Sequence, residues 1–224
     1  MNLCVVGGHS GDEAVTSGAL IHKYTKHGHK AVLLSLTNGD GGHPELSREE
    51  YRIQKDREAV EAAAVLGAEA VLFPISSGQL PVSNEVAEKM AAVFEEHKID
   101  CIITHWRDCI HTDHVAAHYN TLKACQKWGK SVPVFFAENW EDSQNYCPEY
   151  RIALDPDDID AWAKACNCFE FFRKCFYKFQ YEKYYRNLFA NHGFELRGEY
   201  GCALMPYRVP GPRGSDCIPG FDIL

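Results

Sequence analysis

Short β-rich apolar runs and longer helix-like segments alternate through the first 136 residues, and this alternation limits the fold more than any other feature. Strands that alternate with helices are typical of a parallel sheet covered by helices. We therefore predict a Rossmann-like α/β fold, with a mostly parallel sheet and helices on both faces. The predicted strands occupy residues 2–7, 31–37, 70–74, 101–105 and 132–136. The predicted helices occupy residues 13–27, 47–66, 84–97 and 114–128.

The last third of the chain differs in character. Residues 155–187 have a helical pattern and are rich in aromatic side chains, which is typical of core packing. Residues 197–207 resemble a final strand, so the predicted fold ends in an aromatic-rich helix and short β additions. Since no linker or repeat interrupts the sequence, we expect a single domain over residues 1–224.

Charge and composition exclude several classes of protein. The net charge is −8, from 23 basic and 31 acidic residues, which argues against nucleic acid and anionic membranes as partners. No apolar run is long enough to span a membrane, and no signal-peptide pattern is found. Ten cysteines are scattered along the chain as reduced core thiols are, so we expect a cytoplasmic protein. The sequence leaves a homo-oligomer open.

Polar residues gather just beyond two of the predicted strands. Residues 7–13 read GGHSGDE and follow the first strand, and residues 106–114 read WRDCIHTDH and follow the 101–105 strand. Ligands of open parallel sheets bind at the carboxyl ends of the strands. Histidine and aspartate with one open position suit a catalytic zinc ion, whereas a lone histidine is more often solvated or hydrogen-bonded in the core. Two clusters at corresponding strand ends favour a metal site.

Three other sites are disfavoured. The glycines after the first strand do not match the G-x-G-x-x-G pattern of dinucleotide binding. Cys166 and Cys168 lack the spacing and the second pair of ligands that a metal clip needs. No G-x-S-x-G segment indicates a serine nucleophile.

The polar segments resemble motifs of the PIG-L/LmbE-like family of metal-dependent de-N-acetylases. Residues 9–13 read HSGDE where the family has His-Pro-Asp-Asp-Glu, and residues 111–114 read HTDH where it has His-x-Asp-His. The helix segment KDREAVEAAAVLG at residues 55–67 and the loop TNGDGG at residues 37–42 are also similar. The resemblance covers about residues 2–136, and the aromatic remainder matches loosely.

The resemblance implies roles for individual residues. By position, His9, Asp12 and His114 correspond to the family's zinc ligands, although another divalent metal is compatible. His111 corresponds to the histidine that stabilises the tetrahedral intermediate, and Asp113 to the aspartate that orients it. Near the mouth of the site we expect three substrate contacts, with a solvated surface charge as the alternative for the two basic ones. They are Asp40, Lys55 and Arg107.

One position departs from the family pattern. The family's general base is the first Asp of its first motif, and Gly11 stands there in this chain. Another carboxylate, such as Glu13 or Asp40, could act as the base, or zinc alone could lower the pKa of water enough. The third alternative is that hydrolysis has been lost while metal and sugar binding remain.

The resemblance implies a zinc-dependent hydrolase that removes an acyl group, most simply acetyl, from an N-acetylated amino sugar or glycoside. Its class would be an amidase that acts on a C–N bond other than a peptide bond. The alternative function, motivated by Gly11, is a non-catalytic or weakly catalytic zinc-dependent sugar-binding protein.

Overall fold

A computed structural model describes residues 1–139, 141–176 and 178–208 of the chain. Its centre is a seven-stranded sheet in the order β3-β2-β1-β4-β5-β7-β6. The first five strands run parallel, and β7 pairs antiparallel with both β5 and β6. The strands are β1 (Asn2–His9), β2 (Lys30–Thr37), β3 (Glu69–Leu72), β4 (Cys101–Thr104), β5 (Val134–Ala137), β6 (Tyr150–Leu154) and β7 (Tyr200–Pro206).

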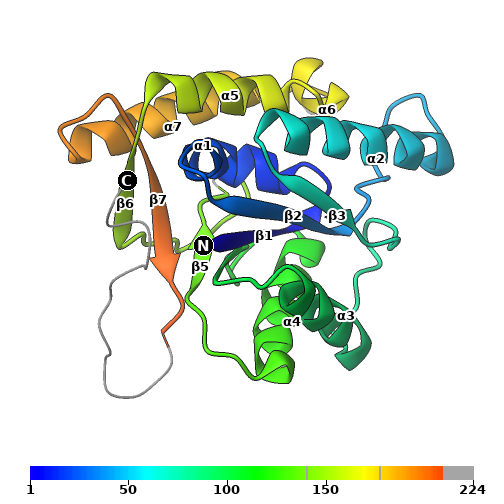
Figure 1. Cartoon of the computed structure of the whole chain (residues 1–224). Coiled ribbons are helices and arrows are strands. Elements are labelled where there is room, and N and C mark those ends of the chain that lie inside the picture. The colour runs from blue at the N-terminus through cyan, green and yellow to red at the C-terminus, as the bar shows by residue number, and fades with distance from the viewer. Residues whose placement is uncertain (140, 177, 209–224) are drawn as a thin grey trace.

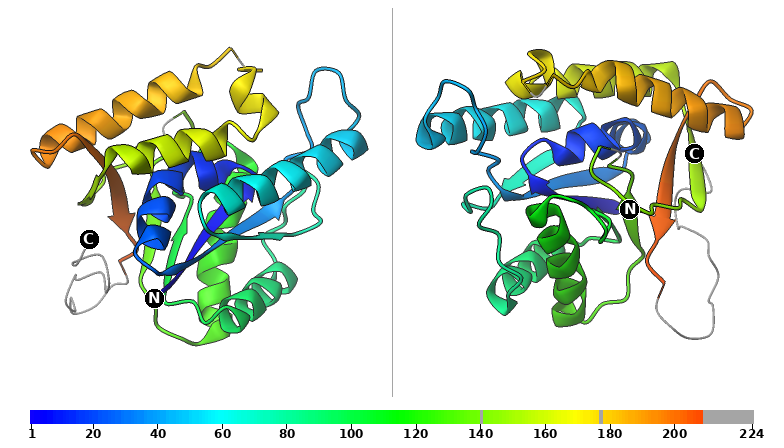
Figure 2. Two further views of the ribbon diagram at one scale, coloured as in Figure 1. Left: turned by 45° about the horizontal axis from the view of Figure 1, so that its top comes forward. Right: turned by 180° about the vertical axis from the view of Figure 1, so that it is seen from behind.

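Helices cover both faces of this sheet, as Figures 1 and 2 show. The helices α3 and α4 pack together on one face, and α1, α2 and α5 lie on the other, with α6 and α7 beside them. The predicted Rossmann-like α/β class is therefore confirmed. No helix in the described part of the chain is both long and apolar enough to cross a membrane. The helices are α1 (Asp12–Lys26), α2 (Arg48–Val65), α3 (Asn84–Glu96), α4 (Thr112–Trp128), α5 (Pro156–Cys166), α6 (Glu170–Arg173) and α7 (Tyr181–Glu195).

The central strand β1 is buried on both sides of the sheet, which explains its continuous apolar sequence. Leu3 and Val5 point into the core beneath α1 and α5, whereas Cys4 and Val6 point into the core beneath α3 and α4. Alternate residues of a strand face opposite sides, so one apolar run supplies both cores.

The strand order reverses next to β1. From β1 the chain builds outward through β2 and β3, and it then crosses back to place β4 on the other side of β1. The loops after β1 and β4 therefore diverge at neighbouring strand ends and leave a crevice, as open α/β sheets do at such points. The two polar segments predicted from the sequence lie at these ends.

The predicted helix over residues 155–187 is wrong as a single element. It is divided into α5, α6 and the start of α7. Cys175 and Lys178 between α6 and α7 have φ values of 48° and 59°, in the left-handed region, which cannot continue a right-handed helix. The strand β6 before α5 was not predicted, although Tyr150, Ile152 and Leu154 alternate with more polar or smaller residues, because the segment is only five residues long.

Trp162 of α5 anchors the aromatic layer against α1. Its side chain is fully buried, and its indole N–H donates a 3.0 Å hydrogen bond to the carbonyl oxygen of Val15. Phe172 and Phe189 pack edge-on against the indole, with ring centroids 5.8 and 5.1 Å away. The aromatic residues of the C-terminal third thus form core, as predicted.

We expect Trp162→Ala to lower the free energy of unfolding by about 3–5 kcal/mol, because it removes a buried aromatic side chain and leaves a cavity. Urea denaturation followed by circular dichroism measures this change. Phe194→Ala is the control, since Phe194 is 77% exposed, and we expect it to change the free energy by less than about 0.5 kcal/mol. Equal losses in the two variants would contradict this account of the core.

Candidate functional site

The turn from β1 into α1 presents His9 and Asp12 on the same side. Gly11 precedes the helix with φ of 111°, a left-handed conformation that glycine adopts without strain. The turn lets Asp12 begin α1 and accept a 2.7 Å hydrogen bond from the backbone N–H of His9. The histidine and the carboxylate are therefore held close together.

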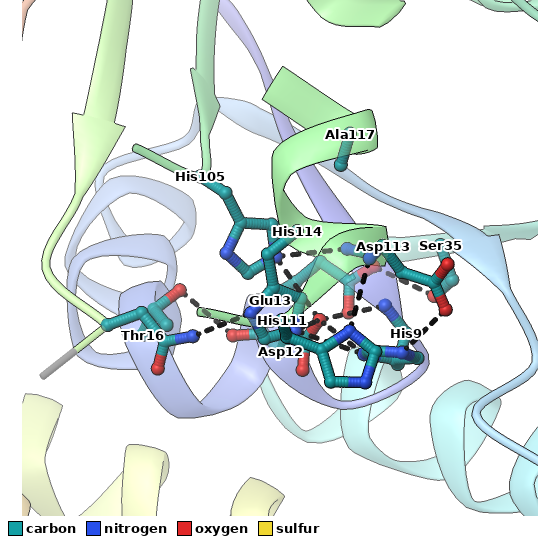
Figure 3. A network of polar contacts seen from close by, with 12 residues as sticks. His9, Asp12, Glu13, Thr16, Ser35, His105, His111, Asp113, His114 and Ala117 are labelled. Carbon is teal, nitrogen blue, oxygen red and sulfur yellow. Dashed lines mark hydrogen bonds and ion pairs between the residues drawn. The ribbon is translucent and has the colours of Figure 1, made fainter. Parts of the chain in front are cut away.

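The second half of the site comes from the connection between β4 and α4. His111 is the N-cap of α4, and its Nδ1 accepts a 3.1 Å hydrogen bond from the backbone N–H of Asp113. One helical turn later His114 projects from the same end of α4. Figure 3 shows His111 and His114 converging with His9 and Asp12 from the first turn.

Three donor atoms form a tight triangle. His9 Nδ1 lies 3.0 Å from His114 Nε2 and 3.3 Å from Asp12 Oδ2, and His114 Nε2 lies 3.1 Å from Asp12 Oδ2. Donors around a tetrahedral zinc with bonds of about 2.0–2.1 Å stand ~3.3 Å apart. The donor set and its spacing therefore fit a divalent ion. His111 offers a further nitrogen within 4.8 Å of the other two imidazoles.

Carboxylates hold both imidazoles of this triangle from behind. His9 Nε2 lies 3.0 Å from Asp113 Oδ2, and His114 Nδ1 lies 2.5 Å from Asp142 Oδ2. Each carboxylate can accept the proton of the outer nitrogen, which would leave the lone pair of the inner nitrogen free to bind a metal in the triangle. This is the arrangement in which histidine binds a metal as a neutral ligand.

Charge is strongly coupled at the triangle. Burial disfavours the ionised form of Asp12, but the neighbouring His114 and His9 outweigh burial and hold its pKa well below the usual range. Burial likewise opposes the charged form of His114, and Asp12 outweighs it and raises the pKa of His114. A divalent cation at this place would satisfy the same carboxylate.

A cavity of about 280 Å³ opens in front of the triangle. Its wall combines polar groups from the strand ends with aromatic rings from α2 and the C-terminal third. The lining residues beyond the triangle include Ser10, Thr16, Tyr51, Lys55, Ser77, His111, Asn139, Glu141, Asp142, Phe171 and Tyr181.

The structure places Glu13 and Asp40 outside the lining of this cavity. Glu13 is buried, accepts hydrogen bonds from the Ser35 hydroxyl at 2.8 Å and the Gly11 N–H at 3.2 Å, and points toward β2. The Asp40 carboxylate accepts hydrogen bonds from the Ser76 hydroxyl and the Ser77 N–H, and so fixes the loop after β3. Both carboxylates are therefore engaged by neighbouring protein groups and do not line the cavity.

Two further predicted contacts differ from expectation. The carboxylate of Asp113 contacts His9 and the backbone N–H groups of Gly78 and Leu80 instead of orienting His111. Arg107 stacks on Trp106 outside the cavity lining, with a largely exposed side chain, so it matches the alternative of a surface charge.

Lys55 does line the cavity and is almost fully buried. Its Nζ donates to the carbonyl oxygen of Ser10 and lies 4.7 and 4.5 Å from the ring centroids of Phe169 and Phe171. Burial lowers the pKa of Lys55 to about 8, although surrounding carboxylates oppose the shift.

Sequence reasoning missed the connection that follows β5. It contributes Asn139, Glu141 and Asp142 to the cavity lining. His105 was also missed, although it ends the β4 segment and its ring stacks on His114 at 4.0 Å. The sequence did contain a signal for these residues, since a third polar cluster directly follows the predicted strand over residues 132–136. This strand, β5, ends at the same edge of the sheet as β1 and β4, so its cluster could have been expected at the site.

The sequence model of the PIG-L family, described as GlcNAc-PI de-N-acetylase, matches residues 4–125. This range is more than half of the chain. The chain belongs to the PIG-L family. The predicted family is thereby confirmed, and with it the predicted class of hydrolytic deacetylase acting on amide C–N bonds. No curated protein matches this PIG-L chain in a sequence search.

Solved structures share the fold of this PIG-L chain at low identity. The N,N'-diacetylchitobiose deacetylase from Pyrococcus horikoshii aligns with a TM-score of 0.79 and 16% identity, over 92% of this chain and 83% of that one. GalB, the 4-carboxy-2-hydroxymuconate hydratase from Pseudomonas putida KT2440, aligns with a TM-score of 0.78 and 18% identity, over 95% and 99%. A deacetylase of the teicoplanin biosynthesis pathway aligns with a TM-score of 0.76 and 12% identity, over 92% and 99%.

In the wild type, we expect the free energy of unfolding to rise as the pH becomes alkaline, and we expect Lys55→Met to reduce this rise. An unfolded lysine keeps its proton up to a pKa of about 10.4. Between about pH 8 and that value the unfolded state binds more protons, so the wild-type free energy of unfolding rises with pH. In the variant, the slope of the free energy of unfolding against pH should be smaller by up to about 1.4 kcal/mol per pH unit. Urea denaturation of the metal-free protein at several pH values measures this slope. Lys127→Met, on the surface of α4, should keep the wild-type slope, and an equal slope in Lys55→Met would contradict this account.

We expect Asp142→Asn to weaken divalent-metal binding about 10- to 100-fold, because His114 loses the carboxylate that fixes its tautomer and orientation. Competition of the metal with a chromogenic chelator measures the affinity. Asp108→Asn is the matched control, since Asp108 lies in the β4–α4 connection and pairs with the exposed Arg107. Unchanged affinity in Asp142→Asn would show that His114 does not bind the metal.

Proposed function

We propose that this protein is a zinc-dependent hydrolase that removes an acetyl group from an N-acetylated amino sugar or its glycoside. The observation that carries the proposal is the triangle of His9, Asp12 and His114 at the base of a cavity in a PIG-L family fold. Two imidazoles and one carboxylate suit zinc, and they leave a coordination position free for chemistry.

The chain's own residues supply the remaining functions. Zinc, when bound, would act as a Lewis acid on the amide carbonyl. Nδ1 of His111 accepts a hydrogen bond, so its ring proton resides on Nε2, and partial burial together with His9 and His114 lowers its pKa. His111 is therefore a neutral donor that can stabilise negative charge developing on the carbonyl oxygen.

The size and lining of the cavity support a sugar-sized substrate. Its volume of about 280 Å³ is just below the range of about 300–1,000 Å³ for small-molecule sites, which favours a small substrate. Tyr51, Phe171 and Tyr181 offer apolar surface, while Ser10, Thr16 and Ser77 can exchange hydrogen bonds with hydroxyl groups. Structural neighbours named as deacetylases of N,N'-diacetylchitobiose and of teicoplanin biosynthesis support the same substrate class.

A cytoplasmic location is part of the proposal. All nine cysteines in the described part of the chain are free, and Cys217 lies outside it. Reduced thiols are typical of a reducing compartment. We also keep the proposal of one domain over residues 1–224, with residues 209–224 outside the described part, and we leave a homo-oligomer open.

We expect the purified protein to contain about one zinc per chain and to release amine from some members of a panel of N-acetylglucosamine conjugates. Asp12→Ala should lose most of the zinc and the amine release, because it removes one donor of the triangle. Metal analysis and a fluorogenic amine assay measure both. Asp160→Ala, on the exposed side of α5, is the control and should keep both.

Three results would change the proposal. Full zinc occupancy in Asp12→Ala would refute the ligand assignment. Zinc binding without amine release by the wild type across the panel would favour the sugar-binding alternative, which Gly11 motivates. Wild-type protein without any zinc would overturn the proposal as a whole.

A further inference from the structure

Position 11 is crowded and strained for any side chain, including one that would act as a base there. A Cβ atom built on Gly11 would lie 3.2 Å from Cε1 of Phe171 and 3.4 Å from the ring of Phe169. The φ of 111° adds strain for any residue other than glycine. Since aromatic rings from the C-terminal third occupy this space, a proton acceptor must come from another wall of the cavity.

Among the described residues, three carboxylates line the cavity: Asp12, Glu141 and Asp142. Asp12 belongs to the donor triangle. Asp142 is engaged by His114 Nδ1 at 2.5 Å and by the backbone N–H of His111 at 2.7 Å. Glu141 is the one of the three whose carboxylate is neither in the triangle nor bonded to one of its imidazoles.

The other titratable side chains in the cavity are poor acceptors. His111 carries its proton on Nε2, because Nδ1 is occupied by the N–H of Asp113. The Lys55 side chain donates to the carbonyl oxygen of Ser10 and lies over two aromatic rings, and with a pKa lowered to about 8 it is still mostly protonated at neutral pH.

Two donors hold the Glu141 carboxylate in place in the wall of the cavity. The hydroxyl of Tyr185 on α7 donates a 2.6 Å hydrogen bond to Oε2. The amide of Asn139, oriented to satisfy its neighbours, donates to the same oxygen at 3.1 Å, and its carbonyl oxygen lies 3.2 Å from His114 Nδ1. The Asn139 side chain thus links Glu141 to His114 of the triangle. Partial burial of the carboxylate raises the pKa of Glu141 above its usual value.

We propose that Glu141 is the general base of the hydrolysis, in place of the side chain that Gly11 lacks. The proposal rests on the deacetylase function proposed above. Water attacks the amide carbonyl carbon and forms the new C–O bond while Glu141 takes one of its protons. When the C–N bond breaks, Glu141 returns this proton to the leaving nitrogen, so that the products are the free amine and acetic acid. Glu141 is thereby regenerated as a carboxylate.

The test compares Glu141→Gln with the wild type on a substrate that the wild type hydrolyses. We expect kcat/KM to fall about 10²- to 10⁴-fold, with zinc content unchanged and the acidic limb of the pH profile lost. Glu138→Gln is the matched control, because Glu138 lies on the same connection but pairs with His192 instead of lining the cavity. It should keep wild-type kcat/KM.

Two measurements separate a base from a structural role. Formate should restore part of the activity of Glu141→Ala, since a small carboxylate can enter the space that the side chain leaves. The second measurement is an NMR titration of the metal-free protein. The side-chain carboxyl resonance of Glu141 is identified by its absence from Glu141→Gln, and it should titrate at a higher pH than is usual for glutamate.

The possible results are distinct. Loss of activity with retained zinc, rescue by formate and a raised titration support the proposal. Activity of Glu141→Gln within threefold of the wild type overturns it and leaves the deacetylase function intact. Loss of activity together with loss of zinc, or without rescue, assigns Glu141 a structural role and also overturns it. A wild type without amine release on any substrate refutes the proposed function, and the base assignment falls with it.

Discussion

β1 and β4 pair in parallel at the centre of the sheet, with Val5 opposite Ile103, and this pairing fixes where the two halves of the site meet. Each strand is buried on both faces, so neither can slide without exposing apolar side chains to water. His9 at the end of β1 and His114 on the helix after β4 are 105 residues apart in sequence and 3.0 Å apart in space. The rigid core therefore fixes the distance between His9 and His114 at the site.

Buried carboxylates orient the histidines that the sheet brings together. Asp113 and Asp142 orient His9 and His114 so that the inner nitrogen of each ring faces Asp12. The three donors lie close together and shift one another's pKa values strongly, and a divalent cation bound between them would interact with all three. Metal binding would therefore stabilise the folded protein as well as prepare it for chemistry.

The aromatic C-terminal third does more than cover one face of the sheet. Trp162 attaches α5 to α1, and the segment that follows carries Phe169 and Phe171 to the turn at Gly11. The same rings surround the ammonium of Lys55. Tyr185 of α7 reaches the other side of the site and binds Glu141. Glycine at position 11, which departs from the family motif, therefore lies directly against the aromatic rings of the C-terminal third.

The sequence alone determined the alternation of strands and helices from β1 to β5, because buried parallel strands and capped helices are set by local patterns, but it predicted neither β6 nor the division of the later helices. The capping box of Ser47 and Glu50 at the start of α2 is an example. It also predicted that the polar segments after β1 and β4 meet at one edge of the sheet, and the resemblance to the family singled out His9, Asp12 and His114 within them as metal ligands. Only the tertiary structure decided that Asp113 serves His9, that Glu13 turns toward Ser35, and that Asp142 and Glu141 join the site. The direction of these side chains depends on packing between segments far apart in sequence, and no local pattern encodes it.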